Sequence, residues 1–81
     1  MRKFSELEIE VLKAMSDVGQ YKGRFEIWNR DTIRGIATQE RVGETLSNLF
    51  IDGFLFRMPG NPNVPYYYAL SANGKDFLDE L

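Results

Sequence analysis

The sequence contains no cysteine and no histidine among its 81 residues. It therefore has no thiol nucleophile, no disulfide, no thiolate zinc site, and no imidazole to act as a base or metal ligand. It also has no run of about 18 apolar residues, the length that a membrane helix needs. The basic residues Arg2 and Lys3 lead into Ser5 and Glu6 rather than into the apolar core of a signal peptide. We expect a cytoplasmic protein without metal, cofactor or membrane contact.

Phosphate-binding loops are absent as well, since neither Gly-x-Gly-x2-Gly nor Gly-x4-Gly-Lys-Ser/Thr occurs. The carboxylate pairs Glu6 with Glu8 and Asp79 with Glu80 fall on helical positions that we expect to be solvated. These absences leave no catalytic constellation, and we expect the protein not to be an enzyme. With 43% hydrophobic residues, residues 1–81 are expected to form one small domain.

The chain lacks a surplus of positive charge. Its 10 basic and 12 acidic residues give a net charge of −2, which disfavours simple attraction to phosphate. The distribution is uneven, because residues 18–70 hold six basic and five acidic residues. Five of these six basic residues are arginine, which suits bidentate contacts to phosphate and guanine. The basic residues are Lys22, Arg24, Arg30, Arg34, Arg41 and Arg57.

A first helix is predicted to start at Ser5, because Ser5 and Glu8 have the spacing of a capping box. Its inner face recurs at helical spacing and consists of Leu7, Val11, Ala14, Met15 and Val18. Gly19 is the expected stop. Ile9 and Leu12 fall beside this stripe, where they either widen the buried face or belong to a subunit interface.

The segment 22–34 allows two interpretations. The one that we prefer is a single helix over residues 24–34 with Gly35 in the turn after it. Its buried residues would be Phe25, Trp28 and Thr32. In the other, residues 25–27 form a short strand, and a helix capped by Asn29 follows with almost no turn before the next helix. Its buried residues would be Ile33, Ile36 and Ala37. In either case Trp28 is expected in the core, or otherwise in a ligand pocket at a dimer interface.

The next helix is predicted to begin after Thr38, a good N-cap, with Glu40 favouring the dipole of its first turn. Its apolar stripe is Val42, Leu46, Leu49 and Phe50. Its polar residues are Gln39, Glu40, Arg41, Glu44, Ser47 and Asn48. Gly53 ends the helix, because glycine adopts the left-handed C-terminal conformation without a steric penalty.

Two strands, over residues 54–58 and 66–70, are predicted on either side of a loop that holds all three prolines. Strand alternation points Tyr66 and Tyr68 inward and leaves Tyr67 outside. Base stacking by the three tyrosines is the lesser alternative. Ser71 caps a last helix, whose apolar face is Gly74, Phe77, Leu78 and Leu81. The order predicts the α+β winged helix-turn-helix fold, with a three-helix core, a two-stranded β-wing and a C-terminal helix.

The chain is similar to the winged-helix regulators of bacteria and archaea, and most to the PadR-like group. Residues 23–27 resemble the group's Gly-Tyr-Glu-Ile-type segment. Residues 46–55 resemble the Leu-x2-Leu-x3-Gly end of its recognition helix, and residues 68–74 the end of its second wing strand, with Ser71 in place of threonine. Gly43 departs from the pattern, since PadR-like proteins commonly have tyrosine there and MarR-like and ArsR-like proteins serine. The resemblance implies a DNA-binding transcriptional regulator.

We expect sequence-specific binding to double-stranded DNA, with residues 38–48 in the major groove and residues 57–63 along the backbone or minor groove. The candidate DNA contacts are Thr38, Gln39, Arg41, Glu44, Asn48, Arg30, Arg34, Arg57, Asn61 and Asn63. We also expect a homodimer. The candidate dimer contacts are Phe4, Ile9, Leu12, Phe77, Leu78 and Leu81. The alternative, favoured by the acidic charge and the single arginine in the wing, is a winged-helix protein–protein interaction module without direct DNA binding.

Overall fold

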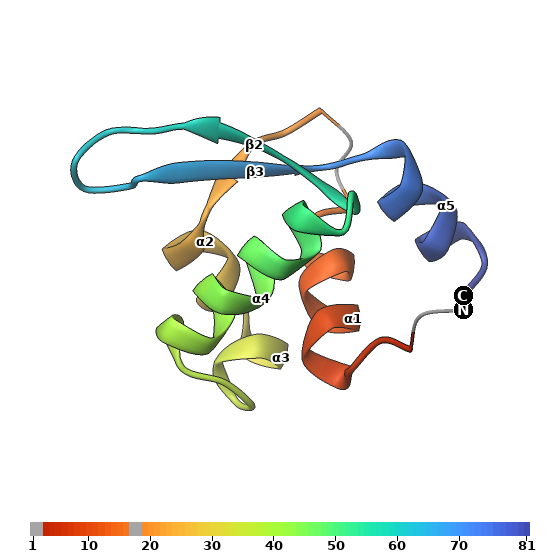
Figure 1. The fold of residues 1–81 in the computed structure, drawn as a ribbon. Coiled ribbons are helices and arrows are strands. Elements are labelled where there is room, and N and C mark those ends of the chain that lie inside the picture. The colour runs from red at the N-terminus through yellow and green to blue at the C-terminus, as the bar shows by residue number, and fades with distance from the viewer. Residues whose placement is uncertain (1–2, 17–18) are drawn as a thin grey trace.

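The computed structural model describes residues 3–16 and 19–81, which form five helices and three strands. Their order is α1 (Glu6–Ala14), β1 (Lys22–Gly23), α2 (Arg24–Trp28), α3 (Asp31–Arg34), α4 (Gln39–Ile51), β2 (Leu55–Pro59), β3 (Tyr66–Leu70) and α5 (Ala72–Asp79). Helices α1 to α4 lie on one side of the β2–β3 hairpin, and α5 follows at the end of β3 farther from the hairpin loop (Figure 1). The α+β class predicted from the sequence is confirmed. No helix of the described ranges has the length and apolar character needed to cross a membrane.

Helix α1 begins as predicted and ends earlier than predicted. The Ser5 hydroxyl accepts a hydrogen bond from the Glu8 N–H at 3.1 Å, and the Glu8 carboxylate accepts one from the Ser5 N–H at 2.9 Å, which completes the capping box. The helix ends at Ala14, with Met15 as its C-cap. The expected stop at Gly19 was therefore wrong, although Gly19 does have a positive φ of 85°. Val18 lies outside the described residues.

Neither interpretation of segment 22–34 was fully correct. Two short helices replace the single helix of the first, and residues 25–27 are helical rather than the strand of the second, although the burial of Ile33 that the second expected is confirmed. Ile27 and Ile33 are both buried, yet six residues apart they would point roughly 120° away from each other on one continuous helix. A break at Arg30, whose backbone is extended, turns α3 so that both isoleucines reach the core. Phe25 is instead 58% exposed. Thr32 and Ile36, each expected to be buried in one interpretation, are also exposed.

The sheet has a third strand that the sequence did not predict. Its order is β1-β3-β2, antiparallel throughout, with Lys22 opposite Tyr68 in the first pair and Arg57 opposite Tyr68 in the second. The bounds of β3 are as predicted, whereas β2 begins and ends one residue later than expected, so Pro59 ends the strand instead of lying in the loop. The Lys22 ammonium donates to the Ala14 carbonyl at 3.0 Å, which ties β1 to the end of α1. Two residues are too few to show the alternating pattern of a strand, so nothing in the sequence indicated β1.

Helix α4 passes through the centre of the core. Val42, Leu46 and Leu49 are fully buried, as predicted. The Thr38 hydroxyl caps its start by accepting from the Arg41 N–H at 3.2 Å. At its end Gly53 has a φ of 86°. The Phe54 N–H donates to the Leu49 carbonyl at 2.8 Å and the Gly53 N–H to the Phe50 carbonyl at 3.0 Å, which together form a Schellman motif.

Helix α5 is joined to the end of α4 through one side chain. The Ser71 hydroxyl accepts from the Gly74 N–H at 3.2 Å, which confirms the predicted cap, and donates to the Gly53 carbonyl at 2.7 Å. Gly74 is buried, and a Cβ there would lie 2.3 Å from the Phe54 carbonyl oxygen. The backbone of α5 therefore packs directly on the turn after α4.

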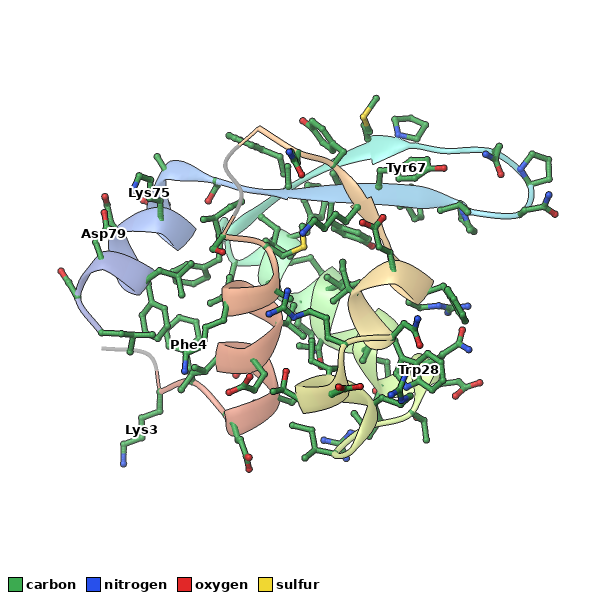
Figure 2. The ribbon with its side chains drawn as sticks, turned by 180° about the vertical axis from the view of Figure 1, so that it is seen from behind. Lys3, Phe4, Trp28, Tyr67, Lys75 and Asp79 are labelled. Carbon is green, nitrogen blue, oxygen red and sulfur yellow. The ribbon has the colours of Figure 1, made fainter. Side chains whose placement is uncertain are left out.

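Most of the predicted dimer contacts are used within the chain. Leu12 is fully buried, so its placement in a dimer interface was wrong, and the wider buried face of α1 is the correct alternative. Phe4 lies between α1 and α5 (Figure 2), with its ring centroid 4.0 Å from that of Phe77. Phe77 and Leu78 are half-buried against the core. Leu81 remains 66% exposed.

Candidate nucleic-acid interface

Helix α4 brings five of the candidate DNA contacts together on one element. Four are exposed, and Gln39 is half-buried. The helix can hold them in a fixed arrangement because both of its ends are capped and its opposite face is fully buried. The five residues are Thr38, Gln39, Arg41, Glu44 and Asn48.

The two arginines of α3 differ in their surroundings. Arg30 is the N-cap residue of α3, and its side chain is exposed. The Arg34 guanidinium donates to the Asp31 carboxylate at 2.6 Å and to the Asn29 side-chain oxygen at 2.7 Å. Its charge is therefore partly balanced, although an exposed pair of this kind contributes little to stability. Of the two, Arg30 is better placed for a phosphate contact.

Arg57 is half-buried and packs against two aromatic rings instead of extending freely into solvent. Its guanidinium carbon lies 4.1 Å from the ring centroid of Phe50 on α4 and 4.1 Å from that of Tyr66 on β3. Aromatic rings at this distance attract a cation through their quadrupoles. Arg57 therefore holds the hairpin against α4, and a phosphate contact would have to compete with both rings.

The loop between β2 and β3 is held by its own hydrogen bonds. The Asn61 side-chain oxygen accepts from the Asn63 and Val64 N–H groups, both at 2.9 Å. The Gly60 N–H donates to the Pro65 carbonyl at 2.8 Å, and a Cβ at Gly60 would lie only 1.8 Å from the Val64 carbonyl oxygen. The predicted contact Asn61 thus shapes the loop with its side-chain oxygen, and Asn61 and Asn63 are both exposed.

A groove of about 610 Å³ lies between one face of α4 and the β3 side of the hairpin. Glu44 and Asn48, both predicted contacts, line it together with Glu40, Arg24 and Tyr66. A smaller hollow of about 240 Å³ places Gln39 of α4 beside Asn63 of the loop. The structure thus brings the outer face of α4 and the hairpin loop to adjoining surfaces.

The sequence did not indicate the part played by Arg24, which lines both hollows. The Arg24 side chain crosses α4 at Gly43, where an added Cβ would lie 3.0 Å from the Arg24 Cδ and 3.2 Å from its Nη1. A glycine inside a helix costs about 1 kcal/mol relative to alanine, so it often marks a close neighbour. Gly43 was the signal, but the sequence did not show which residue approaches it.

The aromatic residues of this region have structural roles. The Trp28 indole N–H donates to the Ala37 carbonyl at 2.9 Å, and the half-buried ring packs on the core, so Trp28 supports the turn before α4. Tyr68 is buried as predicted. Tyr66 is 43% exposed and not inward as expected, because it lies at the far end of β3, beyond the core. Tyr67 is half-buried.

Comparison with models of known protein families and with characterised proteins gives no match to this chain. Across residues 3–16 and 19–81, no three acidic, cysteine or histidine side chains converge in a way that could hold a metal ion.

Proposed function

We propose that this protein is a winged helix-turn-helix protein that binds double-stranded DNA with sequence specificity and regulates transcription in the cytoplasm. The observation that carries the proposal is the exposed polar face of α4 beside a β-hairpin. Thirteen helical residues span about 20 Å, and the major groove, about 12 Å wide, admits one helix. In this proposal the hairpin beside α4 serves as the wing.

In this proposal the outer face of α4 reads base edges. Arg41, exposed in the first turn, donates to guanine, and the Glu44 carboxylate accepts from the amino group of cytosine. Arg30 contacts a phosphate, and Asn63 follows the backbone or minor groove from the hairpin loop. Two carboxylates, Glu40 and Glu44, face the same groove and repel phosphate. Specific base contacts therefore have to supply much of the affinity.

We also propose that the protein binds DNA as a homodimer, because a two-fold dimer presents two such helices to half-sites about 34–36 Å apart. Leu81 supports this, since it is 66% exposed beyond α5. Ile9 of α1 and Phe77 and Leu78 of α5 are half-buried, so a second subunit could cover the part of each that stays exposed.

The alternative function, a protein–protein interaction module, is favoured by Ile51. This residue is 75% exposed at the end of α4, the highest value among the large hydrophobic side chains of the described residues. It lies one helical turn beyond Ser47, which lines the groove. An apolar side chain there suits a protein partner better than a phosphate backbone.

Selection from a random-sequence duplex library, followed by titration of the selected duplex, tests the DNA-binding proposal. Arg41→Ala should lose about 1–3 kcal/mol of binding free energy on the selected duplex and weaken the sequence preference at one base pair. Lys75→Ala is the matched control, because Lys75 is an exposed cation on α5, far from Trp28 and the start of α4 (Figure 2). If both variants lose the same binding free energy, Arg41 contributes only through the net charge of the protein and not through a base contact.

A further inference from the structure

Arg24 is the cation placed between α4 and the hairpin. Among the described residues that line the larger groove it is the only basic one, and it lines the smaller hollow as well. The side chain is exposed, and within the described part of the chain it forms no ion pair. Its charge is therefore available to a ligand.

Two other arginines of this region, Arg34 and Arg57, are engaged with protein groups. Arg34 donates to Asp31 and Asn29. Arg57 lies between the rings of Phe50 and Tyr66. A duplex that places α4 in its major groove carries one phosphate backbone past the space between α4 and the hairpin. Of these three arginines, only Arg24 combines that position with an unengaged guanidinium.

We infer that Arg24 contacts a DNA phosphate at this groove and that Gly43 positions it there. The inference rests on the proposed DNA binding. Glu40 and Glu44 line the groove on the α4 side, so a phosphate there meets two negative charges. Arg24 offsets this repulsion and supplies charge-assisted hydrogen bonds of the kind that guanidinium groups form with phosphate.

Gly43 matters because it lets the Arg24 stem lie directly on the backbone of α4. A Cβ at position 43 would be 3.0 Å from the Arg24 Cδ, closer than ordinary van der Waals contact, so the arginine stem would have to shift by a few tenths of an ångström. The Arg24 side chain is exposed and can move aside without disturbing the core. Gly43→Ala therefore shifts the guanidinium while improving the helix propensity of α4.

The test is a fluorescence-anisotropy titration of a library-selected duplex at several salt concentrations, with the wild type and four variants. Arg24→Ala should weaken binding about tenfold and lower the slope of log K against log salt by about one. Arg24→Lys should keep most of the slope, since it keeps the charge. Lys75→Ala, on α5, should keep the wild-type slope.

The Gly43→Ala variant distinguishes a loss of Arg24 positioning from a loss of folding. We expect its thermal midpoint to equal or exceed that of the wild type, while its affinity for the duplex falls. An unchanged slope for Arg24→Ala would overturn the phosphate contact, and wild-type affinity for Gly43→Ala would overturn the role of Gly43. If the wild type binds the duplex although one of these two results is found, the proposed DNA binding stands without the role inferred for that residue. If the wild type binds no duplex, both proposals fail together.

Discussion

The guanidinium carbon of Arg57 lies 4.1 Å from the ring centroid of Phe50, so a charged side chain of β2 packs on the last turn of α4. Tyr66 lies at the same distance from the guanidinium carbon. Arg57 sits in the middle of β2, opposite Tyr68. The three side chains together fix the hairpin relative to α4. Their packing therefore sets the width of the groove between α4 and the hairpin.

Arg57→Ala should destabilise the fold by about 0.5–2 kcal/mol, because it removes a partly desolvated cation from two aromatic rings. Urea denaturation measures the loss. Arg41→Ala is the matched control, since Arg41 is exposed and its truncation should change the free energy of unfolding by less than about 0.5 kcal/mol. Equal stabilities for the two variants would mean that the rings do not hold Arg57 in solution.

Leu46→Ala should lower the free energy of unfolding by about 2–5 kcal/mol, because Leu46 is fully buried at the centre of α4. A domain of this size has a total stability of only about 4–12 kcal/mol. The variant should therefore be partly or wholly unfolded at growth temperature in a thermal melt followed by circular dichroism. A melt that matches the wild type would contradict the burial of that face.

Gly53→Ala should cost about 1–2 kcal/mol, because the φ of 86° at this position strains any residue with a Cβ. The nearest atom to an added Cβ is the side-chain nitrogen of Asn73 (Nδ2) at 3.6 Å, which is ordinary van der Waals contact, so crowding is not the cause. Gly53→Asn is the control, since asparagine tolerates this conformation better than alanine. If both variants unfold at the same urea concentration, backbone strain does not set the stability of this turn.

Leu81→Asp should shift the proposed homodimer toward monomer, because it places a charge in the most exposed apolar position among the candidate dimer contacts. Sedimentation equilibrium at tens of micromolar measures the state of both proteins. Only monomer in the wild type would contradict the homodimer and leave Phe4, Phe77 and Leu78 as ordinary core residues.

The parts of the fold that the sequence predicted are those with local causes. Ser5, Thr38 and Ser71 were predicted as caps from residue type and position, and each accepts a hydrogen bond from the N–H three residues ahead. The break at Arg30 was missed because its cause is tertiary, the burial of both Ile27 and Ile33. Strand β1 was missed for a similar reason, since Lys22 and Gly23 become a strand only by pairing with β3.

In the candidate site, too, the features with local causes were predicted and those that depend on tertiary packing were not. The outer face of α4 followed from helical periodicity, whereas the groove depends on how far the hairpin lies from α4. The contact between Arg24 and Gly43 joins two helices, and nothing in the spacing of the sequence pairs those two residues. The stacking of Arg57 likewise depends on a register between β2 and β3 that brings Tyr66 beside it.

The most direct test of DNA binding by α4 is a salt-dependent titration of the wild-type protein with its library-selected duplex and with a scrambled duplex of equal length. We predict binding to the selected duplex that weakens linearly in log K with log salt, and poor binding to the scrambled one, since the net charge is −2. Equal affinity for the two duplexes would contradict sequence specificity. Absence of binding to either duplex at low salt would contradict DNA binding itself and favour a protein partner for α4.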